Sequence, residues 1–125
     1  MRAVLQRVSS ASVTVENGKT ESIDTGFVLL LGVHRDDTPD HVDYIVRKTV
    51  HLRVFSDDER KMNRSLIDIG GELLLISQFT LYADTSRGRR PGFDKAAGPE
   101  LANSLYRRAI EAFSDYTRVR TGEFG

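Results

Sequence analysis

Three polar side chains interrupt a strongly apolar stretch in the middle of this 125-residue chain. Ser77, Gln78 and Thr80 stand among leucine, isoleucine and phenylalanine in residues 72–82, which read as one long strand. Burying a hydroxyl or amide without a hydrogen-bond partner costs about 1–3 kcal/mol, so such groups need internal partners or a function. Because side chains alternate along a strand, Gln78 and Thr80 are expected on one face, where they could line a cleft.

The chemistry available to these groups is limited by the lack of a base nearby in sequence. A hydroxyl nucleophile needs a positioned base, yet the histidines of the chain are His34, His41 and His51, all outside the strand. No G-x-S-x-G motif is present. The strand therefore favours a site that polarises and positions a bound substrate, in which the substrate itself or water accepts the proton. The alternative is that backbone groups satisfy all three polar side chains inside the core.

A basic loop follows the strand directly. TSRGRRPGF sets Arg87, Arg89 and Arg90 among glycines, with Pro91 and Phe93 beside them. Guanidinium groups suit phosphate oxygens, and an aromatic ring can stack on a base. Three arginines alone are typical of an ordinary solvated loop. Their position after the interrupted strand indicates the rim of a site for a phosphorylated or RNA substrate.

Composition excludes several other classes of site. The chain has no cysteine, its histidines lack metal-ligand spacing, and no P-loop or dinucleotide-binding glycine motif occurs, so we expect neither metal nor cofactor. The 18 basic and 18 acidic residues balance, which argues against wholesale nucleic-acid binding but allows a local basic patch. No signal-peptide core and no run of about 20 apolar residues is seen, which predicts a cytoplasmic protein without a membrane segment.

The pattern of apolar residues predicts two helices and about seven strands in mixed order. Thr38-Pro39 and Gly98-Pro99 are typical helix starts, and apolar residues follow each at helical spacing. The expected strands are residues 2–8, 12–15, 20–23, 27–33, 52–56 and 72–82. Residues 84–98 are expected to be a loop, and the alternating tail is expected to be a strand without a partner. These elements predict one α/β domain over residues 1–125.

Four stretches together resemble the D-aminoacyl-tRNA deacylase family: MRAVLQRVSSASVTVENG, FVLLLGV, FSDDERKMN and GGELLLISQFTLYADTSRGRRPGF. Ser-Gln-Phe-Thr-Leu followed by Ala-Asp and Arg-Pro-x-Phe is a family signature. The resemblance implies a three-layer α/β/β domain of mixed, partly antiparallel sheets with two main helices, and a cytosolic homodimer. It implies hydrolysis of the ester that joins a D-amino acid, or glycine on the wrong tRNA, to the terminal adenosine of tRNA.

The same resemblance implies roles for particular residues. Ser77, Gln78, Phe79 and Thr80 would form the floor of the aminoacyl-adenosine site, with an oxyanion-binding role at residues 78–80. The 2′-hydroxyl of the terminal ribose would assist the reaction, which fits the missing base; the alternative makes the threonine a nucleophile.

Further residues are expected to act at the substrate site. Arg7 resembles the family arginine that helps to hold the chiral-selectivity loop. The residue types of the basic loop, rather than the resemblance, lead us to expect that Arg87, Arg89, Arg90, Pro91 and Phe93 contact tRNA. We expect no DNA partner. The family also has a Gly-cis-Pro segment near its C-terminus that excludes L-amino acids, and this sequence stops at Gly125 before it. We therefore expect a truncated or divergent chain, and a non-catalytic RNA-binding module or inactive remnant stays open.

Overall fold

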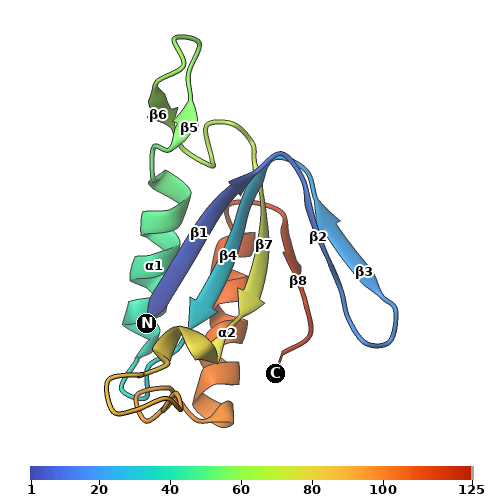
Figure 1. Cartoon of the computed structure of the whole chain (residues 1–125). Coiled ribbons are helices and arrows are strands. Elements are labelled where there is room, and N and C mark those ends of the chain that lie inside the picture. Colours follow the sequence, from blue (N-terminus) through green and yellow to red (C-terminus); the bar gives the residue numbers. More distant parts are fainter. Residues whose placement is uncertain (125) are drawn as a thin grey trace.

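A four-stranded sheet forms the centre of the computed structural model, which describes residues 1–124 (Figure 1). In spatial order its strands are β1 (Arg2–Val8), β4 (Gly26–Gly32), β7 (Glu72–Ser77) and β8 (Val119–Thr121). β1 runs antiparallel to β4, whereas β4, β7 and β8 are mutually parallel. Parallel neighbours need crossover connections, which α1 (Pro39–His51) and α2 (Pro99–Ser114) supply.

Both helices begin where the sequence predicts. Proline occupies the first position of each helix, where its missing N–H costs nothing. At the start of α1 the Thr38 N–H donates to His41 Nδ1 at 3.0 Å, which satisfies one backbone donor next to the helix.

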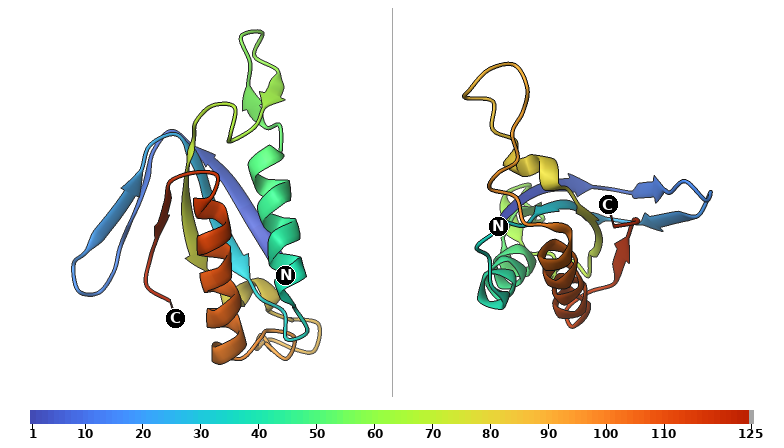
Figure 2. Two further views of the ribbon diagram at one scale, coloured as in Figure 1. Left: turned by 180° about the vertical axis from the view of Figure 1, so that it is seen from behind. Right: turned by 90° about the horizontal axis from the view of Figure 1, so that it is seen from below.

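The helices cover one face of the sheet and form the core with it (Figure 2, left). Apolar side chains recur at helical spacing on α1 and α2 and at alternate positions on β4 and β7. The buried members include Phe27, Leu29, Leu31, Leu73 and Leu75 from the strands, Val42, Val46 and Val50 from α1, and Leu105, Ala109 and Phe113 from α2. Tyr106 of α2 joins this core and donates its hydroxyl to the Leu75 carbonyl at 2.9 Å.

Two hairpins complete the fold: β2 (Ala11–Thr14) with β3 (Thr20–Ile23), and β5 (Phe55–Ser56) with β6 (Met62–Arg64). The predicted strand 52–56 is wrong for residues 52–54, because α1 runs to His51 with Leu52 as its C-cap and β5 comprises Phe55 and Ser56 alone. The α/β class with two main helices and mixed sheets is confirmed. Within residues 1–124, no helix is long and apolar enough to cross a membrane.

The predicted strand 72–82 is also too long. β7 ends at Ser77; the Gln78 N–H still donates to the Leu31 carbonyl at 2.8 Å, and the chain then coils into a 3₁₀ helix, η1 (Phe79–Tyr82). η1 packs closely over Gly32, where an added Cβ would lie only 3.1 Å from Leu81 Cβ. Gln78 and Thr80 therefore do not share a strand face, and the alternation argument fails for them.

The tail differs from the prediction as well. Val119–Thr121 does form a strand, but it pairs with β7 in parallel rather than lying unpartnered. β8 is nevertheless an edge strand of the sheet, as expected for the tail. The helices leave the opposite face of the sheet uncovered (Figure 2, right). On that face Val4 of β1 is 49% exposed, and Val28, Leu30 and Ile76 are half-buried.

Candidate active site

An apolar pocket of about 390 Å³ opens where β7 ends, between η1 and the start of α2. Ser77 borders it, so the first polar group of the interrupted stretch faces a cavity rather than the packed core. The described residues that line it are Ser77, Phe79, Phe93, Ala96, Ala97, Pro99, Ala102 and Phe124. Sequence reasoning singled out three of these residues and missed the rest, since alanines and a proline carry no chemical signal.

Two aromatic rings form one wall of this pocket. Phe79 and Phe93 meet nearly edge to face, with ring centroids 5.1 Å apart and an interplanar angle of 66°. Phe79 remains 52% exposed although it lies beside the core. An exposed ring of this kind is available to stack on a planar group such as a nucleobase.

The side chains of Gln78 and Thr80 interact with each other, because the Gln78 amide donates to the Thr80 hydroxyl. Thr80 is exposed, and Ser77 and Gln78 are half-buried. These groups are therefore not core polar groups satisfied by backbone, which was the alternative from the sequence. Within residues 1–124, neither histidine nor carboxylate bonds to the Thr80 hydroxyl.

Two neighbouring backbone donors lie at the N-terminal end of η1. The first amides of a helical turn have no partner inside that turn. In the described part of the chain the N–H groups of Phe79 and Thr80 make no protein hydrogen bond, whereas Leu81 N–H donates to the Gln78 carbonyl at 3.3 Å. Adjacent free amides can donate to one anionic oxygen.

Arg2 holds the other end of η1. Its guanidinium donates to the Leu81 carbonyl at 2.7 Å and lies 4.6 Å from the centroid of the Tyr82 ring. Burial raises the pKa of the Tyr82 phenol, with the Asp37 charge acting in the same direction and Arg2 opposing it. The His34 ring packs edge-on against the Tyr82 ring, with the two ring centroids 5.4 Å apart. No sequence signal points to Arg2, because the contact joins residues 79 positions apart.

The arginine loop, residues 84–98, closes on itself beside the pocket. Asp84 and Gly92 exchange two backbone hydrogen bonds of 2.8 Å each. Hydrogen bonds from Ser86 lower the pKa of the Asp84 carboxyl. The loop projects beyond the sheet (Figure 2, right).

The loop also forms part of a second pocket, of about 430 Å³. Its charged lining residues are Arg35, Arg87, Arg90, Lys95, Asp84 and Asp94. Arg89 and Pro91 are exposed and do not line it. Four basic and two acidic side chains give this second pocket an excess of positive charge. It lies next to the apolar pocket, because Gly92 and Asp94 of the second pocket flank Phe93, which lines the first.

Arg7 lies apart from the other predicted site residues. In the sheet it stands opposite Phe27, whereas Ser77 stands opposite Leu31, a separation of four strand positions or roughly 13 Å. Its guanidinium donates to the Val54 carbonyl at 2.6 Å. One chain therefore does not bring Arg7 to residues 77–80. Among residues 1–124, no group of three or more histidine, aspartate or glutamate side chains could hold a metal.

Comparison with known proteins gives concordant matches. The family profile described as D-Tyr-tRNA(Tyr) deacylase matches residues 4–125. The D-aminoacyl-tRNA deacylase of Clostridioides difficile (strain 630) is 54% identical over 125 residues, covering 99% of this chain and 84% of that protein. The protein of the same name from Thermosipho africanus (strain TCF52B) is 48% identical over 126 residues, covering 100% of this chain and 85% of that protein.

Solved structures share the fold. The c-Myc DNA Unwinding Element Binding Protein superposes with a TM-score of 0.91 at 38% identity, covering 100% of this chain and 86% of that one. A probable eukaryotic D-amino acid tRNA deacylase superposes with a TM-score of 0.82 at 18% identity, covering 98% of this chain and 88% of that one.

Proposed function

Because the chain belongs to the D-aminoacyl-tRNA deacylase family, we propose that it hydrolyses the ester of D-aminoacyl-tRNA and releases a free D-amino acid and tRNA. The observation that carries the proposal in this chain is the pair of free amides at Phe79 and Thr80, beside an apolar pocket with an exposed aromatic wall. Ester hydrolysis needs donors for the oxygen that becomes negative, and these amides are such donors.

In the reaction we propose, the ester carbonyl oxygen accepts hydrogen bonds from the two amides. A water oxygen attacks the carbonyl carbon, and the tetrahedral intermediate collapses with release of the ribose 3′-oxygen. The vicinal 2′-hydroxyl of the RNA relays the proton from the water to the leaving oxygen. The substrate is assigned this role because no histidine or carboxylate of the described residues bonds to Thr80.

The apolar pocket is proposed to receive the terminal adenosine. Its lining suits a planar, weakly polar ring, and stacking of a base on an aromatic side chain contributes about 1–3 kcal/mol. Thr80 accepts a hydrogen bond from the Gln78 amide, next in the chain to Ser77 and Phe79, which line the pocket. Glycine attached to the wrong tRNA presents the same ester and ribose, so we propose it as a second substrate of this site.

We further propose a cytoplasmic homodimer, formed through the sheet face that the helices leave uncovered. Val4, Val28, Leu30 and Ile76 give that face an apolar surface, and such surfaces mark protein interfaces. The substitution Val4→Asp places a charge on this face and is expected to shift the chain toward monomer in sedimentation velocity at micromolar concentration. An unchanged dimer would exclude this face.

The function is tested with two substrates that differ by one oxygen. D-Tyr-tRNA and its 2′-deoxyadenosine-terminated counterpart are incubated with the enzyme, and released D-tyrosine is measured. We expect rapid release from the first and resistance of the second. Full-rate cleavage of the deoxy substrate would return the nucleophile role to Thr80, and no release from either would favour a non-catalytic RNA-binding module.

A further inference from the structure

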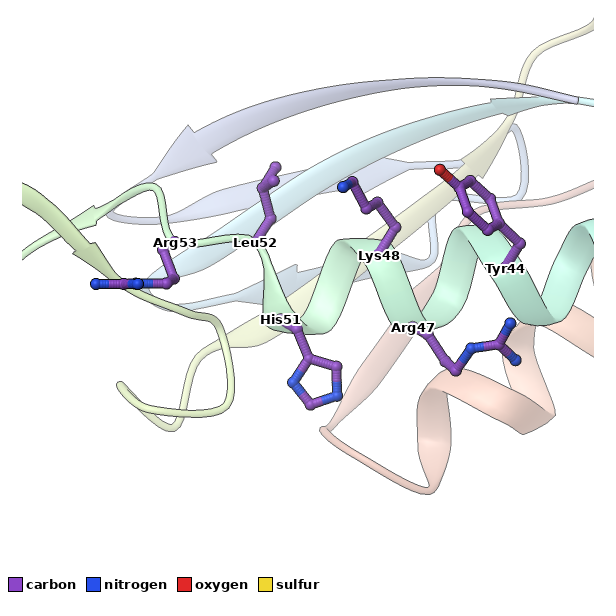
Figure 3. A pocket seen from close by; sticks show the side chains of 6 residues that line it. All are labelled: Tyr44, Arg47, Lys48, His51, Leu52 and Arg53. Carbon is purple, nitrogen blue, oxygen red and sulfur yellow. The ribbon is translucent and has the colours of Figure 1, made fainter.

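A basic groove of about 520 Å³ lies on the outer side of α1 and is not part of the site described above. Its lining residues are Tyr44, Arg47, Lys48, His51, Leu52 and Arg53. Figure 3 shows Tyr44, Lys48 and Leu52 along one side of the helix and Arg47 and His51 along the other, with Arg53 beyond the helix end. We call this surface the α1 groove.

The α1 groove concentrates charge in a chain whose overall charge is zero. Arg47, Lys48 and Arg53 are basic side chains, and none of the described residues that line the groove is a carboxylate. In residues 1–124, neither Arg47 nor Lys48 has a carboxylate within ion-pair distance. Such side chains are free to neutralise an external anion.

The acidic neighbour on the same helix is already engaged. Asp43 accepts two hydrogen bonds from the Arg108 guanidinium of α2, at 2.9 and 3.2 Å. That interaction is the main reason that the pKa of Asp43 is lowered, and the charge of Arg47 adds a smaller effect. Asp43 is therefore paired mainly with Arg108 and offsets little of the positive charge of the α1 groove.

One residue of the α1 groove adds more than charge. The Tyr44 ring is 57% exposed and lies one helical turn before Lys48. An exposed aromatic ring among cations is typical of surfaces that bind RNA, in which phosphates pair with the cations while sugars or bases contact the ring.

The position of the α1 groove fits the proposed substrate. α1 starts directly after the His34 segment, which packs against Tyr82 of η1, and it extends away from the site. At about 1.5 Å per residue, Lys48 lies roughly 13 Å along the helix and its end roughly 20 Å. A nucleic-acid strand advances about 3.4 Å per phosphate, so this span corresponds to about four to six nucleotides.

We propose that the α1 groove binds phosphates of the tRNA acceptor arm, a few nucleotides inward from the aminoacylated end. This proposal rests on the proposed function, since it places the body of the same substrate. Arg7 adds a further cation beside the groove, because its guanidinium donates to the carbonyl of Val54, the residue that follows Arg53. The groove would then contribute to binding of whole tRNA and nothing to a substrate limited to the terminal nucleotides.

The test compares two substrates and two kinds of variant. Arg47→Gln/Lys48→Gln removes two charges, and Arg47→Glu/Lys48→Glu reverses them. The control is Arg107→Gln, an exposed charge of α2 outside the groove. Each enzyme is assayed on full-length D-aminoacyl-tRNA and on a D-aminoacylated ACCA tetranucleotide, at several salt concentrations.

We expect both double variants to lower kcat/KM on full-length tRNA by about tenfold or more at low salt. The neutral variant should also reduce the salt slope by about 2, because each of the two removed cations would otherwise neutralise one phosphate. The activity of the double variants on the tetranucleotide should not change, and the activity of the control enzyme should not change on either substrate. The proposal would be overturned if the double variants lost as much kcat/KM on the tetranucleotide as on full-length tRNA. It would also be overturned if the Arg107→Gln control lost as much as the double variants.

Binding of uncharged tRNA separates this proposal from the proposed function. If no substrate is cleaved, weaker tRNA binding by the double variants at unchanged control binding still supports the α1 groove. Unchanged tRNA binding by the double variants would overturn it, whatever the activity, and would leave the groove to an acidic protein partner.

Discussion

Phe79 and Phe93 bring two separate segments into one wall: Phe79 belongs to η1, and Phe93 to the arginine loop, yet their ring centroids lie 5.1 Å apart. The pocket that holds the proposed reaction is thereby joined to the loop that carries the arginines. Positioning of the terminal nucleotide and binding of the RNA backbone are therefore expected to depend on each other.

Phe93→Ala tests this connection. Aromatic pairs contribute about 0.5–1.5 kcal/mol beyond the area that they bury, so removal of the ring should leave Phe79 mobile and weaken stacking of the adenosine. We expect KM to rise by up to about tenfold, since about 1.4 kcal/mol corresponds to a factor of ten. Phe93→Leu keeps the bulk and should have a smaller effect; equal KM values for both variants and the parent would argue against stacking.

Thr80→Val tests the role of the hydroxyl. The side chain is exposed, so the free energy of unfolding should change by no more than about 0.5 kcal/mol. If the hydroxyl accepts from the Gln78 amide and donates its own proton to the reacting ester, kcat should fall by about 10²–10³, the size expected when one donor to the developing oxyanion is removed. Activity indistinguishable from background would instead indicate that the threonine is an obligatory nucleophile. If the variant is destabilised but its folded fraction turns over substrate at the normal rate, Thr80 does not belong to the site.

The arginine loop is tested by replacing Arg87, Arg89 and Arg90 with alanine together. Without these guanidinium groups to bind phosphates, tRNA binding should weaken and depend less steeply on salt. The melting temperature should barely move, because all three side chains are exposed. A salt slope equal to that of the parent would make this an ordinary solvated loop.

Tyr106→Phe gives a prediction that depends on pH. Burial raises the pKa of the Tyr106 phenol from 10.0 to about 12, so its neutral form is the one that stabilises the fold. Below pH 10 the hydrogen bond to the Leu75 carbonyl is fully present, and the variant should be less stable by about 1 kcal/mol. As pH rises toward 12 the parent loses this advantage. Urea unfolding at pH 8 and pH 11.5 should show the difference shrinking; a difference that grows would contradict the assignment.

The sequence predicted the elements whose signals are local. Proline at the first helical position and apolar spacing located both helices, and the apolar run 27–33 became β4 at Gly26–Gly32. The end of β7 was not predictable, since polar and apolar residues alternate over 78–82 as they do in a strand. They coil because Tyr82 is buried against His34, Arg2 holds Leu81, and Gly32 admits the close approach.

The site was predicted to a similar extent. Of the residues singled out from the sequence, Ser77, Phe79 and Phe93 line one pocket, whereas Gln78 and Thr80 are adjacent in the chain but do not line it. The remaining wall comes from the start of α2 and from Phe124, small or apolar residues whose role depends on the crossover that returns the chain to β8. Arg7 was predicted by resemblance alone, and within one chain it lies at the far end of the sheet.

The place where β7 ends has a consequence for local opening of the molecule. From Leu73 to Leu75 this strand has a hydrogen-bonded neighbour on each side, whereas no strand within residues 1–124 pairs with the backbone from Phe79 to Tyr82. Amide protons of Leu73 to Leu75 should therefore exchange with solvent only through global unfolding, whereas those of Phe79 and Thr80 should exchange in the native state. The segment proposed to bind the ester can thus order around a ligand without any change in the sheet that carries it.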